Sequence, residues 1–318
     1  MSGEIMKQMK NSILITAGSA YLDIDAYACA VAMAELLNLQ GVNAVAYSKA
    51  PCNYSVCGSL TASGQILREL PLAISEEEAE YIIVDVSDPE FLKNSVALDR
   101  VVEVYDHHVG FEDYWRARIG DGSHIEFIGA AATLIYREWR RAELQGRMSR
   151  ETALLLIAAI LDNTLNLTSG NTTEEDIEVF DELCSLARVG EDFRNSYFIE
   201  VQKNVEADLK NALFGDIKRV RNNEILPEKV AQLCVWNAES VLARLTEIRG
   251  WFSDDQWMIN IIDLSKNCSF FLCDDIECQQ KIEQAFDLYF GSGIAKTKVP
   301  YLRKQIIKRT LFYIRNIK

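Results

Sequence analysis

The sequence is poor in proline, glycine and positive charge, and it contains no long apolar run. Only 5 prolines and 16 glycines occur in 318 residues, which argues against long disordered segments. No stretch approaches the roughly 18 apolar residues of a membrane-spanning helix, so we expect a soluble protein without a membrane partner. The 33 Lys and Arg are outnumbered by 47 Asp and Glu, giving a net charge of −14. This excess excludes a broad surface for a nucleic-acid polymer, but it does not exclude a small anionic substrate.

Paired cysteine motifs are also missing. The eight cysteines are scattered through apolar or helical stretches, and none forms the double C-x-x-C arrangement of a structural zinc site. The N-terminal residues do not resemble a secretory signal peptide, so we expect reduced thiols in a cytoplasmic protein.

The first half of the chain alternates apolar runs with amphipathic helical patterns, which is typical of a parallel α/β sheet. The run YIIVDV is continuously hydrophobic, as buried parallel strands are. A Thr-Thr pair followed by three acidic residues indicates a further helix start at 172–176. The predicted strands are 12–17, 43–47, 81–86 and 101–105, and the predicted helices are 25–39, 130–143 and 150–161.

Polar residues at 187–194 indicate a linker, and 318 residues are enough for two hydrophobic cores. We therefore expect one domain at 1–188 and another at 189–318. The second is expected to be a smaller mixed α/β domain with a flexible loop at 291–293. Its predicted strands are 230–236, 258–263 and 269–273, and its first predicted helix is 196–211.

Three predicted strands are followed by acidic or imidazole side chains. Asp23 and Asp25 follow the first, Asp85 ends the third, and Asp106-His107-His108 follows the fourth. Ligands of parallel sheets bind beyond the carboxyl ends of the strands, so these groups are expected to lie together. Each has a simpler interpretation when it is taken alone. Asp23 and Asp25 could cap a helix, and a turn at the strand end could satisfy the carboxylate of Asp85. A fourth candidate, Asp162-Asn163, follows a predicted apolar helix and could be only its C-terminal turn.

The triplet at 106–108 favours a functional interpretation most strongly. The chain has only three histidines, and two of them stand next to each other beside an aspartate. Because adjacent residues leaving a strand diverge, one imidazole can coordinate a metal while the other faces the substrate. An aspartate beside a histidine can also orient a metal ligand. The third histidine, His124, lies in a polar stretch and is expected on the surface.

Carboxylates with imidazoles and no thiolate suit Mn²⁺, with Mg²⁺ or Co²⁺ as substitutes. Several converging carboxylates repel one another, and two divalent ions would relieve that repulsion. A metal pair activates a bridging water and stabilises the charge that develops on a phosphoryl group. Paired carboxylates of the glycosidase type would leave the two histidines without a role.

The order of these motifs resembles the DHH phosphoesterase superfamily. D-x-D, the strand-end aspartate and DHH are followed by Gly129-Ala-Ala-Ala-Thr133 and Ile160-Leu-Asp-Asn-Thr164. Residues 161–176 are similar to the DHH–DHHA2 branch of manganese-dependent (family II) inorganic pyrophosphatases, exopolyphosphatases and prune-like proteins. The resemblance covers nearly the whole chain. It implies a parallel-sheet DHH domain and a smaller mixed α/β DHHA2-type domain, with the active site in the cleft between them.

The resemblance also implies roles for individual residues. Asp85 resembles a carboxylate that bridges two metals, and His108 resembles an imidazole that contacts phosphate. The predicted metal ligands are Asp23, Asp25, Asp85, His107, Asp162 and Asn163; the predicted catalytic residues are His108, Asp85 and Asp106; and the predicted substrate-binding residues are His108, Lys203, Arg303 and Lys304. Without the resemblance, the basic residues would be interpreted as solvated surface charge.

The chain departs from the pattern of its apparent relatives at three positions. Ser19 stands where pyrophosphatases have a histidine, Asn163 replaces an aspartate before Thr164, and Leu302 occupies an expected basic position. The predicted function is metal-dependent hydrolysis of phosphoanhydride bonds in inorganic polyphosphate or pyrophosphate, with a modest preference for an exopolyphosphatase-like substrate. Two alternatives stay open: a phosphodiesterase for short nucleotides, and a non-catalytic homologue whose metal site has decayed. A homodimer is compatible with the sequence.

Overall fold

The structure is a computed structural model that describes residues 12–18, 21–61, 66, 68–72, 74–252 and 256–317. Ser19, one of the three departures, lies outside these residues. The chain divides into two compact units, Met1–Gly190 and Glu191–Lys318. Within the described ranges, the helices are too short or too polar to cross a membrane.

The first unit is built on a parallel sheet of five strands in the order β2-β1-β3-β4-β5, which confirms the predicted fold class. The strands are β1 (Ile13–Thr16), β2 (Ala44–Ala46), β3 (Glu80–Val84), β4 (Val101–Asp106) and β5 (Ser123–Ile125). Strand β5 was not predicted, because it has only three residues and two of them are polar. His124 therefore lies on an edge strand, and its ring stacks on Tyr105 with 4.4 Å between the ring centroids.

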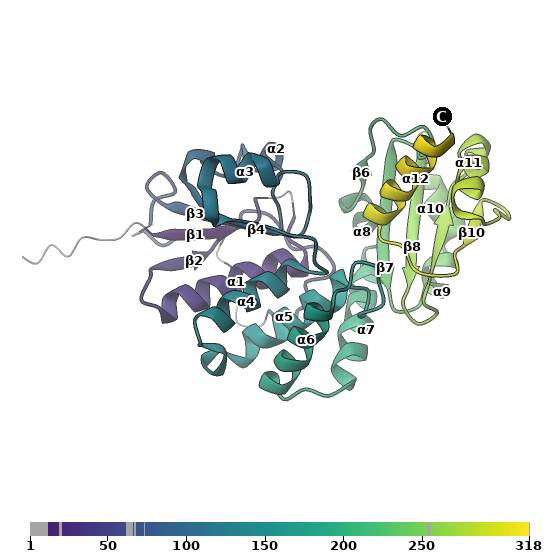
Figure 1. Ribbon diagram of the computed structural model, residues 1–318. Helices are drawn as coiled ribbons and strands as arrows, with labels where there is room; N and C mark the ends of the chain where they lie inside the picture. The colour runs from purple at the N-terminus through teal and green to yellow at the C-terminus, as the bar shows by residue number, and fades with distance from the viewer. Residues whose placement is uncertain are drawn as a thin grey trace, which may run out of the picture. The chain divides into compact units, whose positions relative to one another are not determined.

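Helices cover both faces of this sheet (Figure 1). Helices α2 and α3 lie on one face, where Leu92 and Trp115 join the sheet residues Ile83 and Val104 in one core cluster. Helix α1 lies on the other face and packs against α4 and α5. The helices are α1 (Ile24–Leu39), α2 (Pro89–Leu92), α3 (Glu112–Ile119), α4 (Ala131–Arg141), α5 (Arg150–Asn163) and α6 (Glu174–Ala187).

Helix α1 is buried on nearly all sides, as its sequence requires. It is apolar around its whole circumference and rich in alanine, so neighbouring helices can approach it closely. Helix α5 is similarly apolar, and Glu35 of α1 accepts hydrogen bonds from the backbone and hydroxyl of Ser149, the N-cap of α5. Helix α6 begins within the predicted helix start, and Thr173 and Asp176 form a capping box there. These contacts fix the first turns of α5 and α6.

The second unit contains a mixed sheet in the order β10-β9-β8-β7-β6, in which only β7 and β8 pair in parallel. The predicted mixed α/β architecture is thus confirmed. Phe271 of the sheet, Phe286 of α11 and Ile306 of α12 belong to its core cluster. The elements are β6 (Lys218–Arg219), β7 (Lys229–Val235), β8 (Trp257–Asp263), β9 (Cys268–Leu272), β10 (Ile294–Lys296), α7 (Asp192–Ala207), α8 (Leu209–Gly215), α9 (Glu239–Leu242), α10 (Leu245–Trp251), α11 (Ile276–Phe286) and α12 (Arg303–Ile317).

Candidate metal centre

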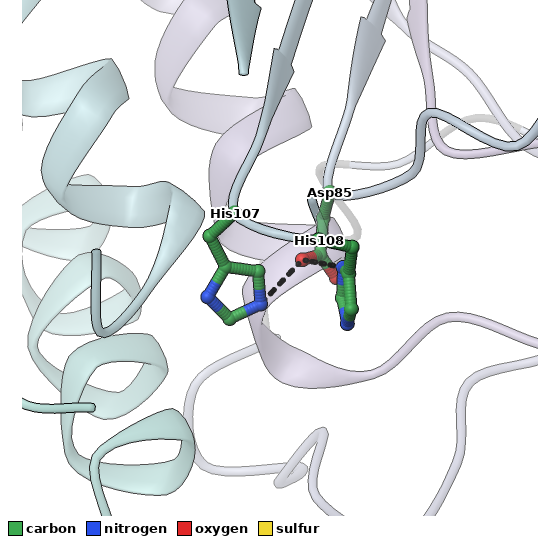
Figure 2. Close-up of side chains that lie close together, drawn as sticks. All are labelled: Asp85, His107 and His108. Atoms are coloured by element: carbon green, nitrogen blue, oxygen red, sulfur yellow. Dashed lines mark ion pairs between the residues drawn. The ribbon is translucent and has the colours of Figure 1, made fainter. Parts of the chain in front are cut away.

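The ends of β3 and β4 bring Asp85, His107 and His108 together (Figure 2). One ligand atom from each of the three side chains lies within 4.8 Å of the others. The two strands are neighbours with Val84 opposite Tyr105, and the backbone N–H of Asp85 donates to the carbonyl of Tyr105 over 2.8 Å. Asp85 then leaves the strand with a φ of 57°, in the left-handed region. Such a conformation is uncommon outside glycine, and aspartate and asparagine adopt it more readily than most residues.

His107 is held in one orientation by backbone carbonyls. Its Nδ1 lies 2.9 Å from the oxygen of Gly129 and 3.3 Å from that of Ile128. Carbonyl oxygens only accept hydrogen bonds, so Nδ1 carries the proton and Nε2 presents its lone pair. Nε2 faces Asp85 Oδ1 at 3.4 Å, and the His107 side chain is fully buried. Metal-binding imidazoles are commonly held in this way.

His108 is oriented by a different partner and is more open. Its Nδ1 lies 2.9 Å from Asp106 Oδ1, which also accepts the backbone N–H of His108. Its side chain is 45% exposed, and the two imidazole rings stand almost perpendicular to each other. Asp106 therefore orients His108, the more exposed of the two imidazoles. The sequence predicted that Asp106 can orient a metal-binding histidine, without indicating which one.

Negative charge accumulates around Asp85 without matching positive charge. Burial raises the pKa of the Asp85 carboxyl well above its usual range, and the charges of Asp23, Asp25 and Asp106 raise it further. Burial and the neighbouring Asp23 also raise the pKa of Asp25 to about 7. Among the described residues, no hydrogen-bond donor reaches Asp85 Oδ1 or Asp106 Oδ2. Buried carboxylates of this kind are costly unless they are protonated or bind a cation, so the donor set fits a divalent metal.

Asp23 and Asp25 also have structural partners. Asp23 is the N-cap of α1 and accepts from the backbone N–H of Ala26. The two oxygens of Asp25 accept from the backbone N–H groups of Ala131 and Ala132, each over 2.9 Å. The capping interpretation thus describes real contacts of Asp23, and Asp25 connects α1 to the start of α4. Metal binding by either carboxylate stays a prediction.

The other predicted residues lie outside the group formed by Asp85, His107 and His108. Asp162 and Asn163 form the half-buried last turn of α5. In the second unit, Lys203 is exposed on α7 and Lys304 is half-buried in the first turn of α12. Their roles stay predictions.

Arg303 lies beside Lys304 but is only 7% exposed. Its guanidinium forms a two-pronged ion pair with Asp216, with N–O distances of 2.8 and 3.0 Å. It also donates to the carbonyl of Val230. No local pattern indicates this pair, because 87 residues separate the two partners. The predicted role of Arg303 in binding phosphate is untested, and a phosphate would have to compete with Asp216 for the guanidinium.

No protein-family model matches the chain. A relative from Bacillus pumilus, named "probable manganese-dependent inorganic pyrophosphatase", is 26% identical over 308 residues, covering 90% of this chain and 94% of the relative.

Two solved structures share the fold. A candidate family II inorganic pyrophosphatase from Methanococcus jannaschii superposes with a TM-score of 0.65 at 19% identity, over 95% of this chain and 100% of the other. An exopolyphosphatase-related protein from Bacteroides fragilis superposes with a TM-score of 0.52 at 14% identity, over 98% and 93%. The resemblance to the DHH–DHHA2 branch of phosphoesterases, predicted from the motifs, is therefore confirmed.

Proposed function

We propose that this chain is a metal-dependent hydrolase of phosphoanhydride bonds in pyrophosphate or inorganic polyphosphate. The observation that carries the proposal is the pairing of buried Asp85 with His107, whose Nε2 is directed at the carboxylate over 3.4 Å. The names of relatives that align over 90% of the chain support Mn²⁺ as the metal and pyrophosphate as a substrate. The small anionic substrate agrees with a net charge of −14 only if bound cations supply positive charge locally.

Asp85 and His107 would hold the metal, and Asp23, Asp25, Asp162 and Asn163 are proposed to complete its ligands. A bound divalent ion would polarise the phosphoryl group and make water a better nucleophile at neutral pH. Asp85 is placed to be a ligand shared by two metal ions, because its carboxylate lies near both histidines and is affected by the negative charges of Asp23 and Asp25. We propose that two ions bind there.

His108 is proposed to contact the substrate. Asp106 holds its Nδ1, so Nε2 of this half-exposed ring is the nitrogen left to meet a phosphate oxygen. As an imidazolium, His108 would donate from both nitrogens, Nδ1 to Asp106 and Nε2 to the anion. Lys203, Lys304 and Arg303 are proposed to neutralise the remaining oxygens, as cations do in phosphoryl transfer.

One assay series tests this function. The purified protein would be given Mn²⁺, Mg²⁺ or Co²⁺ and offered pyrophosphate, tripolyphosphate, long polyphosphate or a dinucleotide. We expect phosphate release from at least one of the inorganic substrates and none without a divalent metal. Turnover of the dinucleotide alone would contradict the proposal. Absence of both turnover and bound metal would support a homologue with a decayed site.

A further inference from the structure

The backbone that holds His107 is itself held by a buried carboxylate from another helix. Gly129, between β5 and α4, accepts from Nδ1 of His107 over 2.9 Å. Asn171 also donates to this carbonyl, over 3.2 Å. The N–H of the same Gly129 donates to Asp176 Oδ2 over 2.9 Å. The orientation of His107 therefore depends on contacts that begin in the first turn of α6.

Asp176 has more partners than a helix cap requires. The backbone N–H of Thr173 donates to the Asp176 carboxylate and the backbone N–H of Asp176 donates to the Thr173 hydroxyl, which together form the capping box at the start of α6. The Thr173 hydroxyl also donates to the carboxylate. It also accepts from Gly129 and from the hydroxyl of Thr133, which are 47 and 43 residues away. The side chain is fully buried, and its two carboxylate oxygens together accept four hydrogen bonds.

Gly129 allows this approach because it has no side chain. A Cβ at this position would lie 2.4 Å from Asp176 Oδ2 and 2.7 Å from Cγ2 of Thr164. Both distances are too short for a real Cβ contact, so any larger residue would displace the carboxylate or the backbone. Gly129 and Asp176 are therefore packed tightly against each other, and Gly129 carries the carbonyl that holds His107.

We infer that Asp176 is a positioning residue for His107. It fixes the Gly129 backbone so that the carbonyl keeps the proton on Nδ1 and leaves the lone pair of Nε2 directed toward Asp85. Asp176 acts through this backbone and touches neither substrate nor metal. The consequence for metal binding rests on the proposed function, whereas the consequence for the His107 tautomer does not.

The test compares Asp176→Asn with Glu174→Gln. Glu174 is an exposed acidic residue in the same first turn of α6, so its substitution removes the same charge from the same helix end. Side-chain ¹⁵N NMR of the metal-free protein reports the tautomer of His107, with His107→Gln used to assign the signal. Calorimetric titration with MnCl₂ reports affinity, and circular dichroism with thermal melting verifies folding.

We expect the Nδ1–H tautomer in the unsubstituted protein and in Glu174→Gln, and a mixture of tautomers in Asp176→Asn. Mn²⁺ affinity should fall by about 10–100-fold in Asp176→Asn alone, the usual cost of losing a partner that orients a ligand. A folded Asp176→Asn protein with the original tautomer would overturn the inference. If Asp176→Asn does not fold, Thr133→Val tests it by removing one of the same contacts, and an unchanged tautomer there would also overturn it. If the unsubstituted protein binds Mn²⁺ but hydrolyses nothing, the proposed function fails while the positioning role stands.

Discussion

Two buried ionisable side chains, Arg303 in the second unit and Asp85 in the first, have opposite electrostatic surroundings. In the second unit, Arg303 faces Asp216 in a two-pronged ion pair, so the charges of the pair cancel within the protein. In the first unit, Asp85 faces other carboxylates, and its pKa is raised by burial and further by their charges. The first arrangement is complete in itself. The second requires protons or a bound cation, as expected of the proposed metal-binding cluster and not of a structural ion pair.

The largest expected effect comes from Asp85→Asn. Asparagine tolerates the left-handed backbone at this position, so the local fold should persist. The substitution removes the central carboxylate of the cluster, and we expect metal-dependent turnover to fall by about 10³-fold or more, because a metal supplies several kcal/mol of transition-state stabilisation. Phosphate release and bound Mn²⁺ measured by elemental analysis check this.

The control for this prediction is Asp121→Asn, which removes an exposed carboxylate of the same unit. The metal-free melting temperature of Asp85→Asn should not decrease, because the substitution relieves repulsion among buried carboxylates. Full activity of Asp85→Asn, or loss of activity with undiminished Mn²⁺ content, would contradict a ligand role for Asp85.

Unlike Asp85→Asn, Asp216→Ala is expected to lower the stability of the fold. Arg303 would keep its burial but lose its carboxylate, and breaking a buried pair by removing one partner costs about 3–5 kcal/mol. Denaturant unfolding of the intact chain, monitored by tryptophan fluorescence, measures this loss. The double variant Asp216→Ala/Arg303→Met should recover part of it, because no unpaired charge remains. A loss below about 1 kcal/mol in the single variant would show that the pair is not needed for stability.

The proximity of Asp85, His107 and His108 followed from the sequence, because it depends on local patterns and on strand direction. Apolar runs located β3 and β4, and the rule that parallel strands end at one edge placed Asp85 near His107 and His108. The start of α6 likewise followed from its threonine pair and the acidic residues after it, although the capping box itself was not predicted. Local periodicity and strand direction were sufficient for these predictions.

The hydrogen bonds that set the chemistry of the site did not follow from the sequence. The carbonyl that holds His107 Nδ1 lies 22 residues away, and the hydrogen bond that the Gly129 N–H donates to Asp176 spans 47 residues. Neither contact has a local signature, because it depends on how α6 and the segment before α4 pack in three dimensions. The Arg303–Asp216 pair was missed for the same reason.

The smallest expected effect compares Lys304 with its neighbour Arg303. Lys304 is half-buried in the first turn of α12, whereas Arg303 is buried and forms an ion pair with Asp216. If Lys304 contacts a phosphate oxygen, Lys304→Ala should raise KM about tenfold, the value of roughly 1.4 kcal/mol of lost binding, with kcat and Mn²⁺ content unchanged. Lys308→Ala, on the same helix but exposed, serves as the control for loss of one positive charge. Steady-state kinetics on pyrophosphate and tripolyphosphate measure both variants. Equal KM values for the two variants would remove Lys304 from the proposed substrate contacts. Its positive charge would then matter no more to substrate binding than the exposed charge of Lys308.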